Sequence, residues 1–148
     1  DGVLDRSVRP NQIFLATLGV VADEKIVEAA KTLFIPGSIR SLDACDPKYK
    51  GRYTGDEDTM RKQAYHNGTA WAWQMPSFVE AAVLTGLVSS ETALSMLCSS
   101  VEILNSGALG HISEISDADA PHAQKGCAAQ AWSVSELLRV LLFLLQNK

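Results

Sequence analysis

Apolar residues recur at helical spacing in five stretches of the chain, and residues that start or stop helices flank these stretches. In the second stretch, Asp23 can cap a helix in which apolar residues repeat at this spacing up to Phe34. Together the stretches predict an all-α chain whose helices cover residues 10–18, 24–34, 70–85, 91–105 and 134–145.

The fifth predicted helix has the clearest start. Ser133 and Glu136 form the S-x-x-E pattern of a capping box, and Trp132 with Leu137 can form the hydrophobic staple around it. From Val134 to Leu145 nearly every side of this helix is apolar. That pattern is typical of a helix surrounded by other helices.

The connections between the predicted helices alternate in length. About four residues join helix one to two and three to four, whereas roughly 25–35 residues join two to three and four to five. Long segments in compact domains usually carry a function. In an up-and-down array both long segments lie at one end, beside helix N-termini whose free N–H groups favour polar ligands. We expect the functional face there, joined by the segment DRSVRPNQ before helix one.

Composition narrows the class of protein. The 148 residues are 47% hydrophobic and 20% charged, which is enough for one domain with a sizeable core. The formal net charge is −4 and no basic patch stands out, so nucleic acid is not an expected partner. The longest apolar run, Val140 to Leu145, is far shorter than the roughly 20 residues that span a bilayer, so no membrane partner is expected.

The start of the chain and its cysteines add two expectations. The chain begins at Asp1 without an initiator Met or a visible signal peptide, which suggests a fragment or a processed chain. Cys45, Cys98 and Cys127 are odd in number and far apart, and no CxxC pair occurs. This usage favours reduced thiols in a cytoplasmic protein over a zinc site.

Aromatic and polar residues gather in the first long segment. Trp71 and Trp73 lie two residues apart, so in a helix they cannot share a face. One interpretation places both in the core. Another is a sugar platform, in which flat rings contact the C–H faces of a sugar while Arg40, Asp56 and His66 contact its hydroxyls. The pattern leaves both interpretations open.

The second long segment contains HISEISDADAPH, with Glu114, Asp117 and Asp119 between His111 and His122. This density of carboxylates fits a solvated loop, a metal site or the acid–base part of an enzyme. The two histidines lack the compact spacing of zinc motifs, so we expect no metal.

Four segments resemble one family: SVRPNQIF, IRSLDACDPKYKGRYTGD, AYHNGTAWAW and GHISEISDADAPHAQKGCAAQAWSVSELLR. They are similar to the C-terminal part of the glycogen-debranching enzymes, the amylo-α-1,6-glucosidase domain. They occur in the family's order over almost the whole chain. The sequence departs from the family at Ala72, Ser116, Ala118 and Gln124, where Pro, Phe, Gly and Arg are usual, which leaves the details of the substrate pocket open.

The resemblance implies that residues 1–148 are the C-terminal portion of an (α/α)6 barrel, with about five of its twelve helices. It also implies hydrolysis of α-1,6-linked glucose at the branch stubs of glycogen, with inversion and without a cofactor. Inverting glycosidases use a general acid and a general base. The resemblance assigns the base to Glu114 and places the acid, an Asp, upstream of this chain.

The expected ligand on the functional face is glycogen or another branched α-glucan. The apolar side of the fifth helix would be covered by the rest of the barrel or by self-association. Two other functions stay open: another (α/α)6 glycosidase, of the glucoamylase or trehalase type, and a non-catalytic helical carbohydrate-binding module. The expected substrate-binding residues are His66, Trp71, Trp73, Asp56, Arg40, Gln130 and Trp132.

Overall fold

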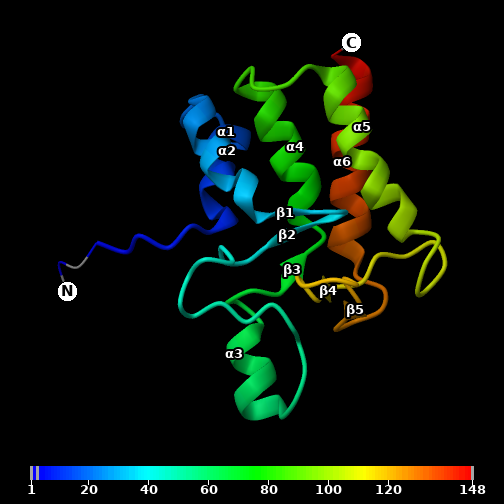
Figure 1. Ribbon diagram of the computed structural model, residues 1–148. Helices are drawn as coiled ribbons and strands as arrows, with labels where there is room; N and C mark the ends of the chain where they lie inside the picture. The colour runs from blue at the N-terminus through cyan, green and yellow to red at the C-terminus, as the bar shows by residue number, and fades with distance from the viewer. Residues whose placement is uncertain (1, 3, 148) are drawn as a thin grey trace.

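Helices fill one half of the molecule and a small sheet lies at their lower ends in Figure 1, where α3 extends beyond the sheet. The structure is a computed structural model and describes residues 2 and 4–147. Helix one is a 3-10 turn, η1, that continues into α1, and helix two is α2 followed by a 3-10 turn, η2. The bounds are η1 Pro10–Ile13, α1 Phe14–Thr17, α2 Glu24–Ala30, η2 Lys31–Leu33, α4 Gln74–Leu84, α5 Ser90–Ile103 and α6 Ala131–Gln146.

Helix α4 is the centre of the helical layer. It packs against α1, α2, α5 and α6, and every residue from Gln74 to Ala82 is buried. Gly86 follows its end in the left-handed conformation, with a φ of 77°, as a helix stop requires. The fully buried side chains around α4 include Ile13, Val27, Leu33, Met75, Phe78, Val79, Leu97, Val140 and Leu144.

The prediction of an all-α chain, and with it of a portion of an (α/α)6 barrel, is wrong. Five short strands form one antiparallel sheet in the order β1-β2-β3-β4-β5, so the fold is mixed α/β. Each strand has only two or three residues, too few to show an apolar–polar alternation in the sequence. The strands are β1 Phe34–Ile35, β2 Ser38–Arg40, β3 Ala70–Trp71, β4 Ile115–Ser116 and β5 Gln124–Lys125.

The sheet ties the two long segments together. In β3, Trp71 pairs with Ile39 of β2 on one side and with Ile115 of β4 on the other. The first long segment therefore supplies β2 and β3, and the second supplies β4 and β5. Backbone pairing thus brings both long segments to one end of the helices, as the alternating connections predicted.

The predicted start of the third helix, at residue 70, is wrong. Residues 70–71 form β3, and α4 begins at Gln74. Thr69, the residue before the predicted start, does not cap a helix, because its hydroxyl donates to the carbonyls of Ala64 and Tyr65.

Helix α6 also differs from its prediction. It begins at Ala131 with Gln130 as N-cap, so Ser133 lies inside the helix, and its buried hydroxyl has no hydrogen-bond partner among the residues described. The capping box with Glu136 and its staple therefore do not form. The helix is also not covered on all sides, since Leu138, Leu142 and Leu145 are 57%, 50% and 55% exposed.

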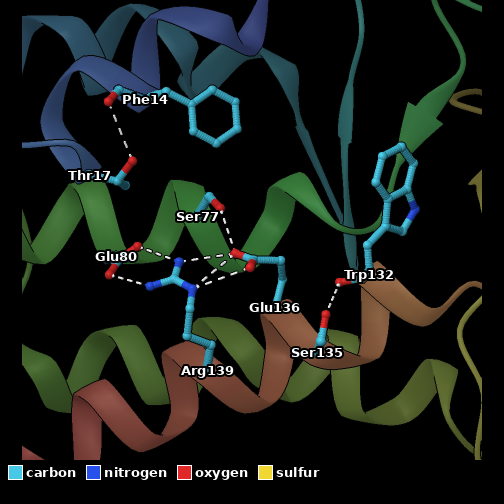
Figure 2. A network of polar contacts seen from close by, with 8 residues as sticks. All are labelled: Phe14, Thr17, Ser77, Glu80, Trp132, Ser135, Glu136 and Arg139. Carbon is cyan, nitrogen blue, oxygen red and sulfur yellow. Dashed lines mark hydrogen bonds and ion pairs between the residues drawn. The ribbon is translucent and has the colours of Figure 1, made fainter.

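One group of ion pairs joins α4 to α6 (Figure 2). The guanidinium of Arg139 donates to both carboxylate oxygens of Glu80, at 2.7 and 2.6 Å. It also contacts Glu136 at 3.0 Å, and the hydroxyl of Ser77 donates to the same carboxylate. The hydrogen bonds to Glu80 raise the pKa of Arg139 above its ordinary value. We call these four residues the Arg139 cluster.

The first long segment contains a further helical piece that the sequence pattern did not indicate. A π-helical turn, η3 (Glu57–Arg61), continues into α3 (Lys62–Ala64). Across the part of the chain that the structure describes, no helix is both long and apolar enough to cross a membrane.

Candidate functional site

A cavity of about 350 Å³ lies where the N-terminal ends of η1, α4 and α6 meet the sheet. Its walls come from the start of η1 and the residue before it, from β3 and the residues shortly before and after it in the chain, and from the start of α6. These are the parts of the chain that the connection lengths placed at one end. The lining residues are Arg9, Pro10, Asn11, Ser41, His66, Trp71, Trp73, Gln74 and Trp132.

Stacked aromatic rings form the walls of this cavity. The rings of His66 and Trp71 are parallel within 2°, with centroids 5.4 Å apart. Trp73 stacks on Trp132 at 5.1 Å and on Phe14 at 5.5 Å. Trp71 meets Trp132 edge-on at 6.1 Å, which joins the two stacks into one wall.

Both tryptophans of the first long segment therefore line one cavity. The expectation that they cannot share a face assumed a helix, and it fails because Trp71 ends β3 while Trp73 is the N-cap of α4. Trp71 is 6% exposed, so it belongs both to the core and to the wall. A place in the core and a place in the wall of a cavity are therefore compatible for these tryptophans.

Arg9 fixes the polar side of the cavity. Its guanidinium donates to the carbonyls of Ser41 and His66 at 3.1 and 2.6 Å, and to the side-chain oxygen of Asn67 at 3.0 Å. One arginine thus connects the segment before η1 with the residue that follows β2 and with two residues that precede β3. Three of its five N–H donors are paired within the chain, and the bond to the carbonyl of His66 holds that residue in place.

Glu114 lies just behind this wall, one residue before the start of β4. The hydroxyl of Tyr65 donates to its Oε1, and the backbone N–H of Cys127 donates to its Oε2 at 3.0 Å. Its own backbone N–H donates to the carbonyl of Cys127 at 2.8 Å. The carboxylate is half-buried and held at both oxygens, which gives it one fixed orientation.

Gly126 makes room for this carboxylate. Its φ is +69°, and a Cβ atom added there would lie 2.5 Å from Glu114 Oε2. Both the backbone conformation and the available space therefore require glycine.

Tyr65 connects Glu114 to the aromatic wall. Its ring packs edge-on against His66 at 4.7 Å and against Trp71 at 4.8 Å. Burial, together with the hydrogen bond to Glu114, raises the pKa of Tyr65 well above its ordinary value. At neutral pH the phenol is therefore a permanent donor to the carboxylate.

The other acidic residues of the second long segment support loops. Asp117 is buried and accepts a hydrogen bond from the backbone N–H of Tyr53 at 2.7 Å. Asp119 accepts from the hydroxyl of Tyr49 at 2.9 Å. Within residues 2 and 4–147, no three His, Cys, Asp or Glu side chains are grouped so that they could hold a metal ion.

The structure separates the predicted site residues into two groups. His66, Trp71, Trp73 and Trp132 come together in the cavity, whereas Arg40, Asp56 and Gln130 are not among its lining residues. Arg40 donates to the carbonyls of Thr32 and Ala118, Asp56 caps η3, and Gln130 caps α6 through its backbone.

The sequence did not single out Tyr65, Gln74 or Ser41, which the structure places at the site. Tyr65 precedes His66 in a polar run, and nothing in the run distinguishes it from a surface tyrosine. Gln74 carried a signal, because it is a lone amide between Trp73 and Met75 at the start of an apolar helix.

Comparison with known proteins identifies the family. A family model described as amylo-alpha-1,6-glucosidase matches residues 1–139 of the chain. A search of the curated proteins finds no match. The family match covers the η1 segment, the aromatic wall, Tyr65 and Glu114. The chain therefore belongs to the amylo-alpha-1,6-glucosidase family, the C-terminal domain of glycogen-debranching enzymes.

Proposed function

We propose that this chain supplies the sugar-binding wall and the general base of an inverting amylo-α-1,6-glucosidase, which releases glucose from the branch stubs of glycogen. The observation that carries the proposal is that Tyr65 connects the cavity lining to the carboxylate of Glu114. Trp71 and His66 line the cavity, Tyr65 packs against both, and its hydroxyl holds Glu114.

The aromatic wall suits the sugar. A pyranose ring presents C–H bonds on its flat faces and hydroxyls at its edge, so it needs flat rings beside polar groups. Trp132 offers such a ring, backed by Trp73, and His66 and Asn11 lie in the same lining. Trp132 is 43% exposed, so part of the wall is open to solvent and to a branched α-glucan.

The geometry of Glu114 suits a base. A general base must hold one orientation while one of its lone pairs contacts water. Each carboxylate oxygen of Glu114 has one protein donor, which leaves further lone pairs for water. The half-buried carboxylate keeps access to solvent.

We place the general acid outside this chain. Glu114 itself lies behind the lining, and within residues 2 and 4–147 the lining contains no Asp or Glu that could be its partner. An inverting pair needs a second carboxyl group about 6.5–9.5 Å from the base, across the scissile bond. Assays of the chain alone on short α-1,6-branched glucosaccharides should therefore show no glucose release. Clear release above the uncatalysed rate would overturn this placement.

The test of the proposed function uses the full-length enzyme that contains this chain. Glu114→Gln should lower kcat for glucose release by at least about 1,000-fold while saccharide binding is retained, because the amide cannot accept the proton of the attacking water. Glu57→Gln is the matched control, since Glu57 is an exposed carboxylate in η3. A Glu114→Gln enzyme near the wild-type rate would rule out Glu114 as the base.

One observation favours a second function, a non-catalytic carbohydrate-binding module. The cavity wall is aromatic and lacks a carboxylate, as a purely binding site would. The same variant separates the two, because a binding module has no turnover to lose. A glucosidase of another linkage, such as a glucoamylase or trehalase type, is separated by comparing saccharides of defined linkage on the full-length enzyme.

We also propose a reducing compartment such as the cytoplasm. The support is that Cys45, Cys98 and Cys127 all carry free, exposed thiols.

A further inference from the structure

Gln74 has an unusual position in the cavity. It is the first residue of α4, it is only 7% exposed, and it lies in the cavity lining next to Trp73. Its side-chain oxygen is buried and has no hydrogen-bond partner among the described residues. Nearly all buried polar groups in folded proteins have a partner, so this amide needs an explanation.

Three neighbouring polar side chains of the cavity, those of Arg9, Ser41 and Trp71, make hydrogen bonds within the chain. Arg9 donates to Ser41, His66 and Asn67, as described above. The hydroxyl of Ser41 accepts from the N–H of Gly68 at 2.9 Å, and the indole N–H of Trp71 donates to the carbonyl of Tyr65 at 3.1 Å. The chain therefore positions these groups for its own structure and offers none of them to the amide of Gln74.

Other buried polar atoms without a partner lie away from the cavity. They include the hydroxyls of Ser100 in α5 and Ser133 in α6, and neither residue is in the cavity lining. A small hydroxyl inside a helix needs no ligand to explain it, because it can turn toward a backbone carbonyl. Gln74 differs, because it has a larger amide group and because it borders the cavity.

The chemistry of the amide matches a sugar edge. An amide carries one acceptor oxygen and two N–H donors on one rigid plane. A half-turn about the last side-chain bond exchanges oxygen and nitrogen, so either end can face the cavity. Neighbouring ring hydroxyls of a pyranose can both donate and accept, so one hydroxyl can give its proton to the oxygen while the next accepts from the N–H.

We propose that Gln74 is a specificity-determining residue of this site, which recognises a hydroxyl at the edge of a pyranose bound in the cavity. The inference rests on the proposed function, because it needs a saccharide in the cavity. The unpaired oxygen becomes paired only when the correct hydroxyl is present, so a sugar without it leaves the amide unsatisfied.

The first measurement is thermal unfolding of the chain without ligand. Gln74→Met keeps the length of the side chain and removes the unpaired polar group, so the unfolding midpoint should stay the same or rise. Ser100→Ala is the matched control, because it also removes a buried unpaired atom and lies outside the cavity. A lower midpoint for Gln74→Met would show that the amide serves the fold and would overturn the inference.

The second measurement is the binding of isomaltose to the same chain, followed by tryptophan fluorescence. Gln74→Met should raise the Kd about tenfold, whereas Ser100→Ala should leave it unchanged. In a series of monodeoxy isomaltoses, one compound should bind wild type about tenfold more weakly and should lose this difference in Gln74→Met, because the two changes remove the same hydrogen bond.

The outcomes separate the two proposals. No binding of isomaltose to wild type would contradict the proposed function, and this inference would fall with it. Binding to wild type that Gln74→Met leaves unchanged would overturn the inference alone. If Gln74→Met does not fold, Gln74→Leu takes its place, since it also removes both the acceptor oxygen and the N–H donors.

Discussion

Tyr65 and Glu114 form the contact between the cavity wall and the candidate base. Their hydrogen bond and the burial of the phenol raise the pKa of Tyr65 above its ordinary value of about 10. The folded state therefore keeps the phenol proton at a pH at which the unfolded chain loses it. Linkage then requires the free energy of unfolding to fall as the pH rises above about 10.

This alkaline loss of stability is a prediction that a single variant tests. Urea unfolding of wild type between pH 7 and 11 should show the free energy of unfolding constant up to about pH 10 and falling above it. In Tyr65→Phe the fall should be smaller, and the remainder should come from Tyr49, whose pKa is also raised by burial and by Asp119. Equal slopes in wild type and variant would show that Tyr65 does not carry the effect.

Gly126 gives a second prediction for single residues. Gly126→Ala should destabilise the chain by about 1 kcal/mol more than Gly110→Ala does. Both positions have a positive φ, 69° and 76°, but only at Gly126 would the new Cβ meet Glu114, while nothing lies within 4 Å of it at Gly110. Chemical denaturation of the two variants measures the difference. Equal destabilisation would mean that the carboxylate can move aside freely.

Single residues also show how far the sequence could predict the site. The four aromatic side chains were predicted because ring chemistry is visible in the residue type alone. Arg40, Asp56 and Gln130 were expected beside them because polar residues in long segments look alike in sequence. In the structure they hold loops and helix ends, and these contacts depend on partners such as Ala118 that are distant along the chain.

At the scale of elements, the Arg139 cluster holds α4 against α6. These two helices carry Trp73 and Trp132 at their N-terminal ends, so their relative position sets the spacing of the stacked pair. Glu80 is 6% exposed, and in Arg139→Met it would lose the one charged partner that it has among the described residues. A buried charge without its partner is costly.

We predict that Arg139→Met lowers the free energy of unfolding by about 2 kcal/mol. This value is lower than for a fully buried pair because the Arg139 side chain is 46% exposed and solvent screens part of the interaction. Lys31→Met is the control, since its pair with Glu28 is exposed on both sides and should contribute less than about 0.5 kcal/mol. Similar losses in both variants would show that the cluster is a surface contact.

The lengths of the helices and strands explain why the sequence predicted the wrong fold class. Helices of two or more turns repeat their apolar positions often enough to be recognised, so α4, α5 and α6 were all predicted. The strands are too short for that, and their pairing is decided by residues such as Ile39, Trp71 and Ile115, which are far apart in the sequence. The capping box was predicted wrongly at Ser133 because the pattern S-x-x-E also occurs inside the first turn of a helix, where Ser133 is the third residue of α6.

For the whole molecule, the exposed leucines of α6 predict self-association of the isolated chain. Leu138, Leu142 and Leu145 follow the spacing of one helix face, and an identical helix from a second copy can cover them. Sedimentation of the wild-type chain should show dimers or larger species, and Leu142→Glu should shift it toward monomer. Leu109→Glu is the control, since Leu109 is 77% exposed in a turn outside this face. A monodisperse wild-type monomer would contradict the prediction.

The two ends of the helical layer differ in whether a tag or a fluorophore can be inserted there without disturbing the cavity. Both long segments meet at the cavity, while the short connections at 18–23 and 85–89 lie at the other ends of their helices (Figure 1). An affinity tag or a fluorophore inserted beside the exposed Gly86 would stand about 16 Å from the wall, the length of the 11-residue α4. The protein can therefore be fixed to a sensor surface by its short turns with the cavity facing the saccharide solution.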